Sequence, residues 1–253
     1  GVIKHDEPMS SHTSLRIGGP AEAMLFPEDV FSLTNALGIA KEEGVPVIVM
    51  GSGTNLLVSD DGIEGVVLSL KAFRNIEITG TVISADAGVP LAALLSFAQK
   101  NGYSGIEALT GIPGCVGGAV YMNAGSFGVE IKDVLMSVTV MNKNGERAVL
   151  RKEEMVFSYR SSNLSRDMMI LGADIALKRD DPASIAGRMK EFLQKKKESQ
   201  PLGEPSAGCV FKNPAGDTAG RLIDAAGCKG MRAGDVEVSA LHANYFINKG
   251  KAA

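Results

Sequence analysis

The sequence predicts an α+β fold, and three observations support this fold class. Apolar residues recur at helical spacing in some segments, short β-branched runs predict strands in others, and one pair of strands flanks a hairpin turn. Helices mixed with hairpins are typical of α+β proteins, whereas a doubly wound sheet would alternate strands and helices regularly.

The elements of the first half follow from local patterns. A helix is expected to begin at Val30, after the acidic residues Glu28 and Asp29 at its positive end, and to end near Gly44. The β-branched run at 45–50 predicts a strand that ends in a glycine turn. Further strands are expected at 66–68, 76–78 and 82–85, and a second helix at 90–99.

The second half contains a hairpin, a long strand and a long helix. Strands are expected at 138–141, 148–150 and 170–177, with residues 142–145 as the hairpin turn. A helix is expected to begin at Pro182 with Asp181 as its cap and to continue to the lysine run. The charged segment 178–182 before this helix predicts a boundary between two domains.

Composition limits the possible functions. With 253 residues, 45% of them apolar, the chain can bury a large core, and its net charge of -3 favours neither nucleic acid nor an anionic membrane as partner. No apolar run approaches the roughly 20 residues of a membrane-spanning helix, and no signal peptide is recognised. Three cysteines without paired spacing and three histidines predict neither a metal site nor a disulfide framework. We therefore expect a cytoplasmic protein.

A glycine-rich turn follows the strand expected at 45–50. Gly51, Ser52, Gly53 and Thr54 are small, so their backbone N–H groups can approach an anion, and two of them add hydroxyl donors. The segment lacks the lysine of a Walker loop and does not open a helix as a dinucleotide-binding fingerprint does. It predicts either a phosphate-binding turn or an ordinary glycine-rich turn.

A second glycine cluster spans residues 110–128. Glycine loses more backbone entropy on folding than other residues, so a dense cluster indicates a close approach of the backbone to a ligand. Two loops of small residues that converge on one long anionic ligand would explain both clusters. An ordinary loop is the alternative.

Five motifs occur together in one order. They are Gly-Ser-Gly-Thr-Asn-Leu-Leu at 51–57, Gly-Ile-Pro-Gly to Asn-Ala-Gly at 111–125, Phe-Ser-Tyr-Arg-Ser-Ser at 157–162, Pro-Ser-Ala-Gly-Cys-Val-Phe-Lys-Asn-Pro at 205–214 and Ala-Gly-Arg-Leu-Ile-Asp at 219–224. On these motifs the chain resembles the UDP-N-acetylenolpyruvoylglucosamine reductase family from about residue 10 to its end. It is most similar to the shorter subtype, which lacks an extra substrate-covering loop.

The resemblance implies a fold and a reaction. An FAD-binding domain of the vanillyl-alcohol-oxidase (PCMH) type is expected over 1–179, built from two α+β subdomains that divide near 71–75, and a smaller α+β substrate-binding domain over 180–253. The implied ligands are non-covalent FAD, NADPH and a UDP-sugar, and a monomer is expected. The implied reaction reduces UDP-N-acetylglucosamine enolpyruvate to UDP-N-acetylmuramate for peptidoglycan synthesis.

By resemblance, both glycine clusters bind the FAD. The implied residues are Gly51, Ser52, Gly53, Thr54, Asn55, Leu56, Thr110, Gly111, Ile112, Pro113, Gly114, Gly117, Gly118, Asn123, Ala124, Gly125 and Ser126.

The family reaction gives the protein two tasks. Hydride passes from NADPH to FAD and then to the enolpyruvyl methylene carbon, after which the carbon that bears the carboxylate is protonated. The protein must therefore stabilise a developing dianion and deliver a proton. Arg160, in the Tyr-Arg-Ser motif, is implied to hold the carboxylate with its guanidinium; without the resemblance it would be interpreted as a surface arginine.

Cys209 is implied to deliver the proton, at a position where many family members have serine. A thiol with a reference pKa of about 8.5 is mostly protonated at neutral pH, so a cysteine is compatible with this task unless a nearby cation strongly lowers its pKa. A small structural cysteine is the alternative. We expect that structural role for Cys115 and Cys228.

The substrate is implied to contact several further residues. These are Tyr159, Lys197, Gln200, Gly208, Lys212 and Asn213. Lysines at a helix end usually face solvent and complement the helix dipole, and we expect this of Lys195 and Lys196. His242 is expected to pack or hydrogen-bond rather than to transfer protons.

The chain departs from the family pattern at its C-terminus. Family members continue past the segment 244–248 with a tail that carries a catalytic glutamate, and no residue here can be matched to it. The substrate-binding domain is therefore expected to be truncated. Two alternatives stay open at this point: another FAD-dependent oxidoreductase of the same fold, and a catalytically impaired flavin-binding version.

Overall fold

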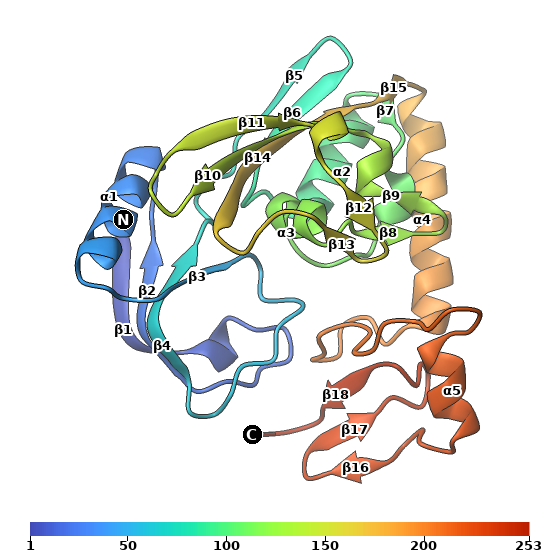
Figure 1. Ribbon diagram of the computed structural model, residues 1–253. Coiled ribbons are helices and arrows are strands. Elements are labelled where there is room, and N and C mark those ends of the chain that lie inside the picture. Colours follow the sequence, from blue (N-terminus) through green and yellow to red (C-terminus); the bar gives the residue numbers. More distant parts are fainter. Residues whose placement is uncertain (253) are drawn as a thin grey trace.

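The computed structural model describes residues 1–252. Two sheets form the larger part of the molecule, and a long helix leads from it to a smaller C-terminal unit (Figure 1). In the view of Figure 1 the first sheet lies at the left, the second at the top and the C-terminal unit at the lower right.

The first sheet is mixed and belongs to the N-terminal segment. Its strand order is β1 (Val2–Pro8), β2 (Pro20–Phe26), β4 (Ile63–Ser69) and β3 (Val47–Met50). β1 pairs with β2 antiparallel, while β4 runs parallel to both β2 and β3. Helix α1 (Val30–Glu42) connects β2 to β3 and begins with a capping box formed by Asp29 and Ser32.

The second sheet is antiparallel throughout. Its strand order is β11 (Arg147–Arg151), β10 (Leu135–Asn142), β14 (Met168–Ala176), β6 (Val82–Asp86) and β5 (Ile76–Thr79). Residues 70–75 connect β4 of the first sheet to β5. The predicted hairpin is confirmed, because β10 and β11 pair around the turn at 142–145.

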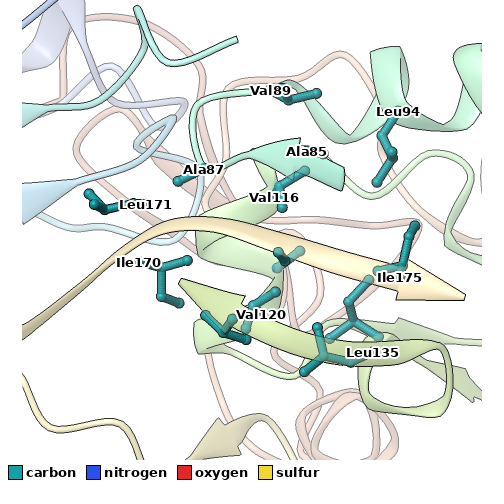
Figure 2. Close-up of a cluster of buried hydrophobic side chains, with 14 of the residues drawn as sticks. Ala85, Ala87, Val89, Leu94, Val116, Val120, Leu135, Ile170, Leu171 and Ile175 are labelled. Carbon is teal, nitrogen blue, oxygen red and sulfur yellow. The ribbon is translucent and has the colours of Figure 1, made fainter. Parts of the chain in front are cut away.

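Two helices cover this sheet, α2 (Leu91–Lys100) and α3 (Val116–Tyr121). Figure 2 shows Val116 and Val120 of α3 beside Ile170 and Ile175 of β14, within one cluster of buried apolar side chains. Burial of this apolar surface stabilises the position of α3, which carries the second glycine cluster.

Helix α4 (Pro182–Ser199) begins with the Asp181 cap that the sequence predicts and packs against the larger part of the molecule. Its Arg188 donates to Glu107 Oε1 (2.7 Å) and to Asp180 Oδ2 (2.6 Å). Both acceptors belong to segments outside the helix, so this charged contact holds α4 along the larger part of the molecule.

The C-terminal unit is small and contacts the N-terminal segment. It contains α5 (Ala219–Ala225) and a sheet of β16 (Arg232–Ala233), β17 (Val236–Val238) and β18 (Phe246–Asn248). Ser14 Oγ donates to the carbonyl of Ser206 (2.6 Å), and Asn248 Nδ2 donates to the carbonyl of Leu15 (3.1 Å). These bonds place the C-terminal unit beside the first glycine turn.

Short elements complete the fold. They are η1 (Met9–Ser11), β7 (Tyr103–Ser104), η2 (Glu107–Leu109), β8 (Gly125–Ser126), β9 (Val129–Glu130), η3 (Ile131–Asp133), η4 (Lys152–Glu154), β12 (Phe157–Ser158), β13 (Ser161–Ser162) and β15 (Lys178–Arg179). No helix within residues 1–252 is both long and apolar enough to span a membrane.

The predicted helices and strands are confirmed, with boundaries shifted by a few residues. The sequence did not predict β1, β2, α5 or the strands of the C-terminal unit. It also treated all of 110–128 as loop, although α3 lies within it. Gly117 and Gly118 have low helix propensity, and packing against the second sheet overrides it.

We predict that Ile175→Ala lowers the free energy of unfolding by about 2–5 kcal/mol, because it leaves a cavity in the core of Figure 2. Denaturant titration of the holoprotein measures this change. Ile39→Ala is the matched control, since Ile39 is 63% exposed and Ile175 only 2%; its effect should stay within about 0.5 kcal/mol. Equal losses in both variants would contradict the assigned core.

Candidate active site

The first glycine turn follows β3 and packs directly against the backbone of the N-terminal segment. Gly53 has φ +66°, and a Cβ at this position would lie 2.0 Å from the carbonyl oxygen of His12. Only glycine therefore fits here without displacing the backbone. Within residues 1–252, the N–H groups of Ser52, Gly53 and Thr54 donate to no protein acceptor. These free donors fit an anion such as the diphosphate of the expected FAD.

The two glycine clusters meet in space, as the sequence predicts. Thr54 Oγ1 donates to the carbonyl of Pro113 (3.4 Å). A Cβ on Gly51 would lie 2.8 Å from Cys115 Sγ, and one on Gly114 would lie 3.3 Å from Thr54 Oγ1. Side chains at either glycine would separate the turns, so the close contact itself requires small residues. Cys115 is buried between them, as expected of a structural cysteine.

Thr110 supplies a second sign of a ligand. Its hydroxyl oxygen is buried and has no hydrogen-bond partner within residues 1–252. An unpaired buried hydroxyl costs free energy unless a ligand or water satisfies it. Its position directly before Gly111 fits a polar atom of the cofactor, and the residues present therefore fit FAD.

The other implied FAD residues lie around the two turns. Asn55 and Leu56 are exposed beyond the first turn, and Gly111 and Ile112 follow Thr110. Gly117 and Gly118 lie in α3, while Ala124 precedes β8, which Gly125 and Ser126 form. Direct contact of each with FAD stays a prediction.

Asn123 links the second glycine cluster to the segment that carries Arg160. The residue is fully buried, and its Nδ2 donates to Glu130 Oε2 (2.9 Å) and to the carbonyl of Ser158 (3.2 Å). Its Oδ1 accepts from the N–H of Lys132 (3.3 Å). The side chain is thus occupied by protein partners, and it acts as a brace for the neighbouring hairpin.

Arg160 occupies the turn of this hairpin. Strands β12 and β13 pair at Ser158 and Ser161, which leaves Tyr159 and Arg160 between them. Arg160 has φ +54°, an uncommon conformation for a residue other than glycine. Its guanidinium donates to the carbonyl of Gly125 (2.8 Å) and lies 4.0 Å from Glu130 Oε1. The hairpin and β8 together aim the guanidinium.

An open cleft of about 350 Å³ surrounds Arg160. Residues Gly125–Glu130, Lys132, Asp133, Tyr159 and Arg160 line it. The hydrogen bond from Lys132 holds the pKa of Glu130 below its usual range. The carboxylate is therefore ionised at neutral pH and partly balances the charge of Arg160.

The prediction that Lys196 faces solvent is wrong. It was expected in solvent with Lys195, but its side chain is 2% exposed and its Nζ donates to the carbonyl of Thr110 (2.7 Å). Burial, with a smaller contribution from the charge of Arg160, lowers the pKa of Lys196 to about 8. Lys195 does face solvent and pairs with Glu191 (2.6 Å).

A helical signal for Lys196 is present in the sequence. It lies on the stripe of α4 that carries Ile185, Met189 and Phe192, at spacings of 11, 7 and 4 residues. A lysine on an apolar stripe indicates a buried ammonium. This signal was missed because lysines at a helix end usually face solvent. Lys197, which the resemblance implies as a substrate residue, is exposed.

Cys209 lies in an exposed loop of the C-terminal unit. Surrounding protein raises the pKa of its thiol, while the charge of Arg160 and the neighbouring Tyr245 hydroxyl lower it to a smaller extent. The net shift is upward, so the thiol is protonated at neutral pH. The sequence left open that a nearby cation could lower the pKa of Cys209 strongly and convert it to a thiolate. The pKa is raised instead, which is compatible with a thiol that donates a proton.

A second open cleft, of about 400 Å³, lies beside Cys209. Asn213 and His242 also line it. Asn213 Oδ1 accepts from the N–H of Ala219 (3.0 Å) at the start of α5. His242 Nδ1 accepts from the N–H of Asn244 (3.3 Å), and burial lowers the pKa of His242; these contacts agree with a packing role.

Arg160 and Cys209 therefore line different clefts, but they are not isolated from each other. The charge of Arg160 acts on the thiol of Cys209 and on the ammonium of Lys196. The structure thus brings three groups from three chain segments within electrostatic reach. Lys212 is exposed, and Gln200 lies at the end of α4.

We predict that Lys196→Met changes the pH dependence of stability above pH 8. Lys196 loses its proton at about 8 in the folded state and at about 10.5 when unfolded. Between these values the unfolded chain binds more protons, so this lysine makes the free energy of unfolding rise with pH. Denaturant titrations at several pH values should show a smaller rise in Lys196→Met than in Lys195→Met, the exposed control. Parallel curves would contradict the assignment.

Comparison with known proteins identifies the domains of this chain and its fold. Residues 21–151 match the model of an FAD-binding domain, and residues 200–253 match that of the C-terminal domain of UDP-N-acetylenolpyruvoylglucosamine reductase. A VAO-type flavoprotein from Myceliophthora thermophila superposes on 63% of the chain with a TM-score of 0.52 at 15% identity, over 32% of its own length. This likeness concerns the fold alone and, with the matched FAD-binding model, confirms the predicted fold type.

Proteins with higher sequence identity to this chain are UDP-N-acetylenolpyruvoylglucosamine reductases. The UDP-N-acetylenolpyruvoylglucosamine reductases of Caldanaerobacter subterraneus and Desulforamulus reducens are 43% and 44% identical, each over 100% of this chain and 84% of the relative. The crystal structure of the enzyme from Thermus caldophilus superposes with a TM-score of 0.87 at 38% identity, over 97% of this chain and 88% of that one. The chain belongs to the UDP-N-acetylenolpyruvoylglucosamine reductase family.

Proposed function

We propose that this chain catalyses the NADPH-dependent, FAD-mediated reduction of UDP-N-acetylglucosamine enolpyruvate to UDP-N-acetylmuramate, a step of peptidoglycan precursor synthesis. Family membership supports the reaction. The assignment of roles is supported by the effect of the Arg160 charge on the thiol of Cys209, together with the convergence of the two glycine turns.

The glycine turns provide the FAD site. The free N–H groups of Ser52, Gly53 and Thr54 would bind the diphosphate, and the unpaired hydroxyl of Thr110 would pair with a further polar atom of the cofactor. When bound, FAD supplies the hydride that saturates the substrate double bond. The protein supplies the orientation, the charge and the proton.

Arg160 binds the substrate carboxylate. Its guanidinium stays charged at any physiological pH and offers two parallel donors to a carboxylate. Because the Gly125 carbonyl and the braced hairpin already fix its direction, little reorganisation is needed when negative charge grows on the substrate. The nearby ammonium of Lys196 adds positive charge that also stabilises the negative charge on the substrate.

Cys209 delivers the proton. Its S–H bond breaks while a C–H bond forms at the carbon that bears the carboxylate, and the charge that was spread over the substrate is left on the sulfur. The raised pKa keeps the proton on the thiol before the step, and Arg160 stabilises the thiolate after it.

The remaining assignments extend this proposal. Tyr159, Lys197, Gln200, Gly208, Lys212 and Asn213 contact the UDP-sugar. Residues 1–179 form the FAD-binding domain and 180–253 the substrate-binding domain, with α4 packed along the first and leading into the second. We also propose that the protein acts in the cytoplasm as a monomer.

Anaerobic spectroscopy tests the proposed function. NADPH should bleach the flavin absorbance of the purified protein, and enolpyruvyl UDP-N-acetylglucosamine should restore it. Absorbance that bleaches but does not return with this substrate would refute the proposed reaction while leaving the FAD site intact.

We predict that Cys209→Ala slows the reoxidation of reduced flavin by the enolpyruvyl substrate by about 10²–10⁴-fold, the usual contribution of a general acid. Flavin reduction by NADPH should be unchanged. In the unaltered protein, reoxidation should decline only above the ordinary pKa range of a thiol, because the acid must be protonated and its pKa is raised. Cys228→Ala is the control and should behave as the unaltered protein; stopped-flow absorbance measures all three.

We predict that Gly53→Ala abolishes stable FAD binding, since its Cβ would overlap the carbonyl of His12. Gly44→Ala is a matched control, because Gly44 has the same φ of +66° but no atom within 4 Å of an added Cβ. The bound flavin per protein after purification reports the effect. Flavin content in Gly53→Ala as high as in Gly44→Ala would contradict the prediction.

A further inference from the structure

Cys209 faces Tyr245 across an isolated antiparallel bridge. The N–H of Val210 donates to the carbonyl of Asn244 (3.0 Å), and the N–H of Phe211 donates to Asn244 Oδ1 (2.9 Å). Side chains that lie directly opposite in an antiparallel pair project from the same side, with Cβ atoms about 4.5–5.5 Å apart. The Cys209 thiol and the Tyr245 ring are thus held next to each other by backbone bonds.

The Tyr245 phenol is fixed from several directions. The residue is 9% exposed, and its hydroxyl donates to Gln200 Oε1 (3.0 Å). The His242 ring meets the phenol ring edge to face, with centroids 4.9 Å apart. Gln200 is itself held by its N–H, which donates to the carbonyl of Lys196 (2.8 Å) at the end of α4. The hydroxyl therefore has one defined acceptor, and Cys209 is the neighbouring side chain that acts on it.

A phenol in this position can respond to the charge of the sulfur. A neutral thiol is a weak acceptor, so the phenol hydrogen is better used by the Gln200 carboxamide. A thiolate is a charged acceptor, and hydrogen bonds to charged groups are about twice as strong as neutral ones. Rotation about the C–O bond moves the hydrogen from one acceptor to the other without moving the ring.

We propose that Tyr245 is a positioning residue for the Cys209 acid, whose hydroxyl turns from Gln200 Oε1 to Cys209 Sγ as the thiol gives its proton to the substrate. This inference rests on the proposed role of Cys209. The proton that forms the C–H bond comes from the thiol, the phenol keeps its own, and the negative charge stays on sulfur until solvent returns a proton after product release.

The titration behaviour of the pair agrees with this division of labour. Burial, together with the neighbouring Cys209, raises the pKa of Tyr245, so the phenol donates a hydrogen bond without losing its proton. Its hydrogen bond favours the thiolate and lowers the pKa of Cys209, as does the charge of Arg160, against the larger effect of burial. The other titratable groups that line the Cys209 cleft are Arg221, Asp224, Lys229 and His242.

A direct titration of the thiol tests the contact without turnover. The flavin-loaded protein with Cys228→Ser leaves Cys209 as the exposed cysteine, because Cys115 is buried. The pH dependence of iodoacetamide alkylation then reports the pKa of Cys209. Tyr245→Phe should raise that pKa by roughly one unit, since the thiolate loses a charge-assisted hydrogen bond.

Tyr103→Phe is the matched control. Tyr103 is also buried and donates its hydroxyl hydrogen to the carbonyl of Gly80, far from the cleft in sequence and in contacts. It should leave the pKa of Cys209 unchanged. Bound flavin content checks that both variants fold.

Single-turnover kinetics then connect the contact to the reaction. In Tyr245→Phe, reoxidation of the reduced flavin by the enolpyruvyl substrate should slow roughly tenfold, and its alkaline limb should move up by the same shift as the thiol pKa. Flavin reduction by NADPH should stay the same. An unchanged thiol pKa in Tyr245→Phe would overturn the inference and leave the proposed function standing. A shifted thiol pKa with an unchanged reoxidation rate and pH profile would overturn the role of Cys209 as the acid, and the positioning role with it.

Discussion

The close contact between the two glycine turns is the constraint on which the rest of the site depends. Gly53 lies against the backbone of His12, Gly51 against Cys115, and Thr54 bonds to Pro113. Three chain segments therefore meet at distances that exclude most side chains. The larger buried cluster already joins residues of both sheets, while a smaller cluster belongs to the first sheet; the contact between the turns adds to this shared core and sets how closely the two glycine turns approach.

The geometry of Arg160 follows from that contact through a series of short links. Val116 and Val120 fix α3 on the second sheet (Figure 2), Asn123 bonds the end of α3 to the hairpin, and the Gly125 carbonyl receives the guanidinium. Asn123, Phe127 and Arg160 all have positive φ. Non-glycine residues keep this conformation where surrounding contacts define it, and such strain is common at functional sites.

Charge in the site is balanced in a way that suits both an anionic substrate and an acid. The carboxylate of Glu130 offsets part of the charge of Arg160, and burial already lowers the pKa of Lys196 to about 8. The net positive field is therefore moderate at Cys209, where desolvation of the thiol by the surrounding protein has the larger effect and keeps the thiol protonated. A stronger field would bind the substrate carboxylate more tightly but would also convert the acid to a thiolate before the reaction.

The sequence by itself determined the α+β class, most of the longer helices and strands, both glycine turns and the family, because local periodicity, β-branched runs and glycine clusters depend on near neighbours in the chain. It could not predict α3, whose glycines disfavour a helix until Val116 and Val120 pack on the sheet. It also placed Lys196 in solvent, because the carbonyl that accepts its hydrogen bond lies 86 residues away in the chain. The pairing of Cys209 with Tyr245 likewise joins residues distant in sequence. Burial and pairing of this kind arise from contacts between segments that no local pattern encodes, and only the tertiary structure decides them.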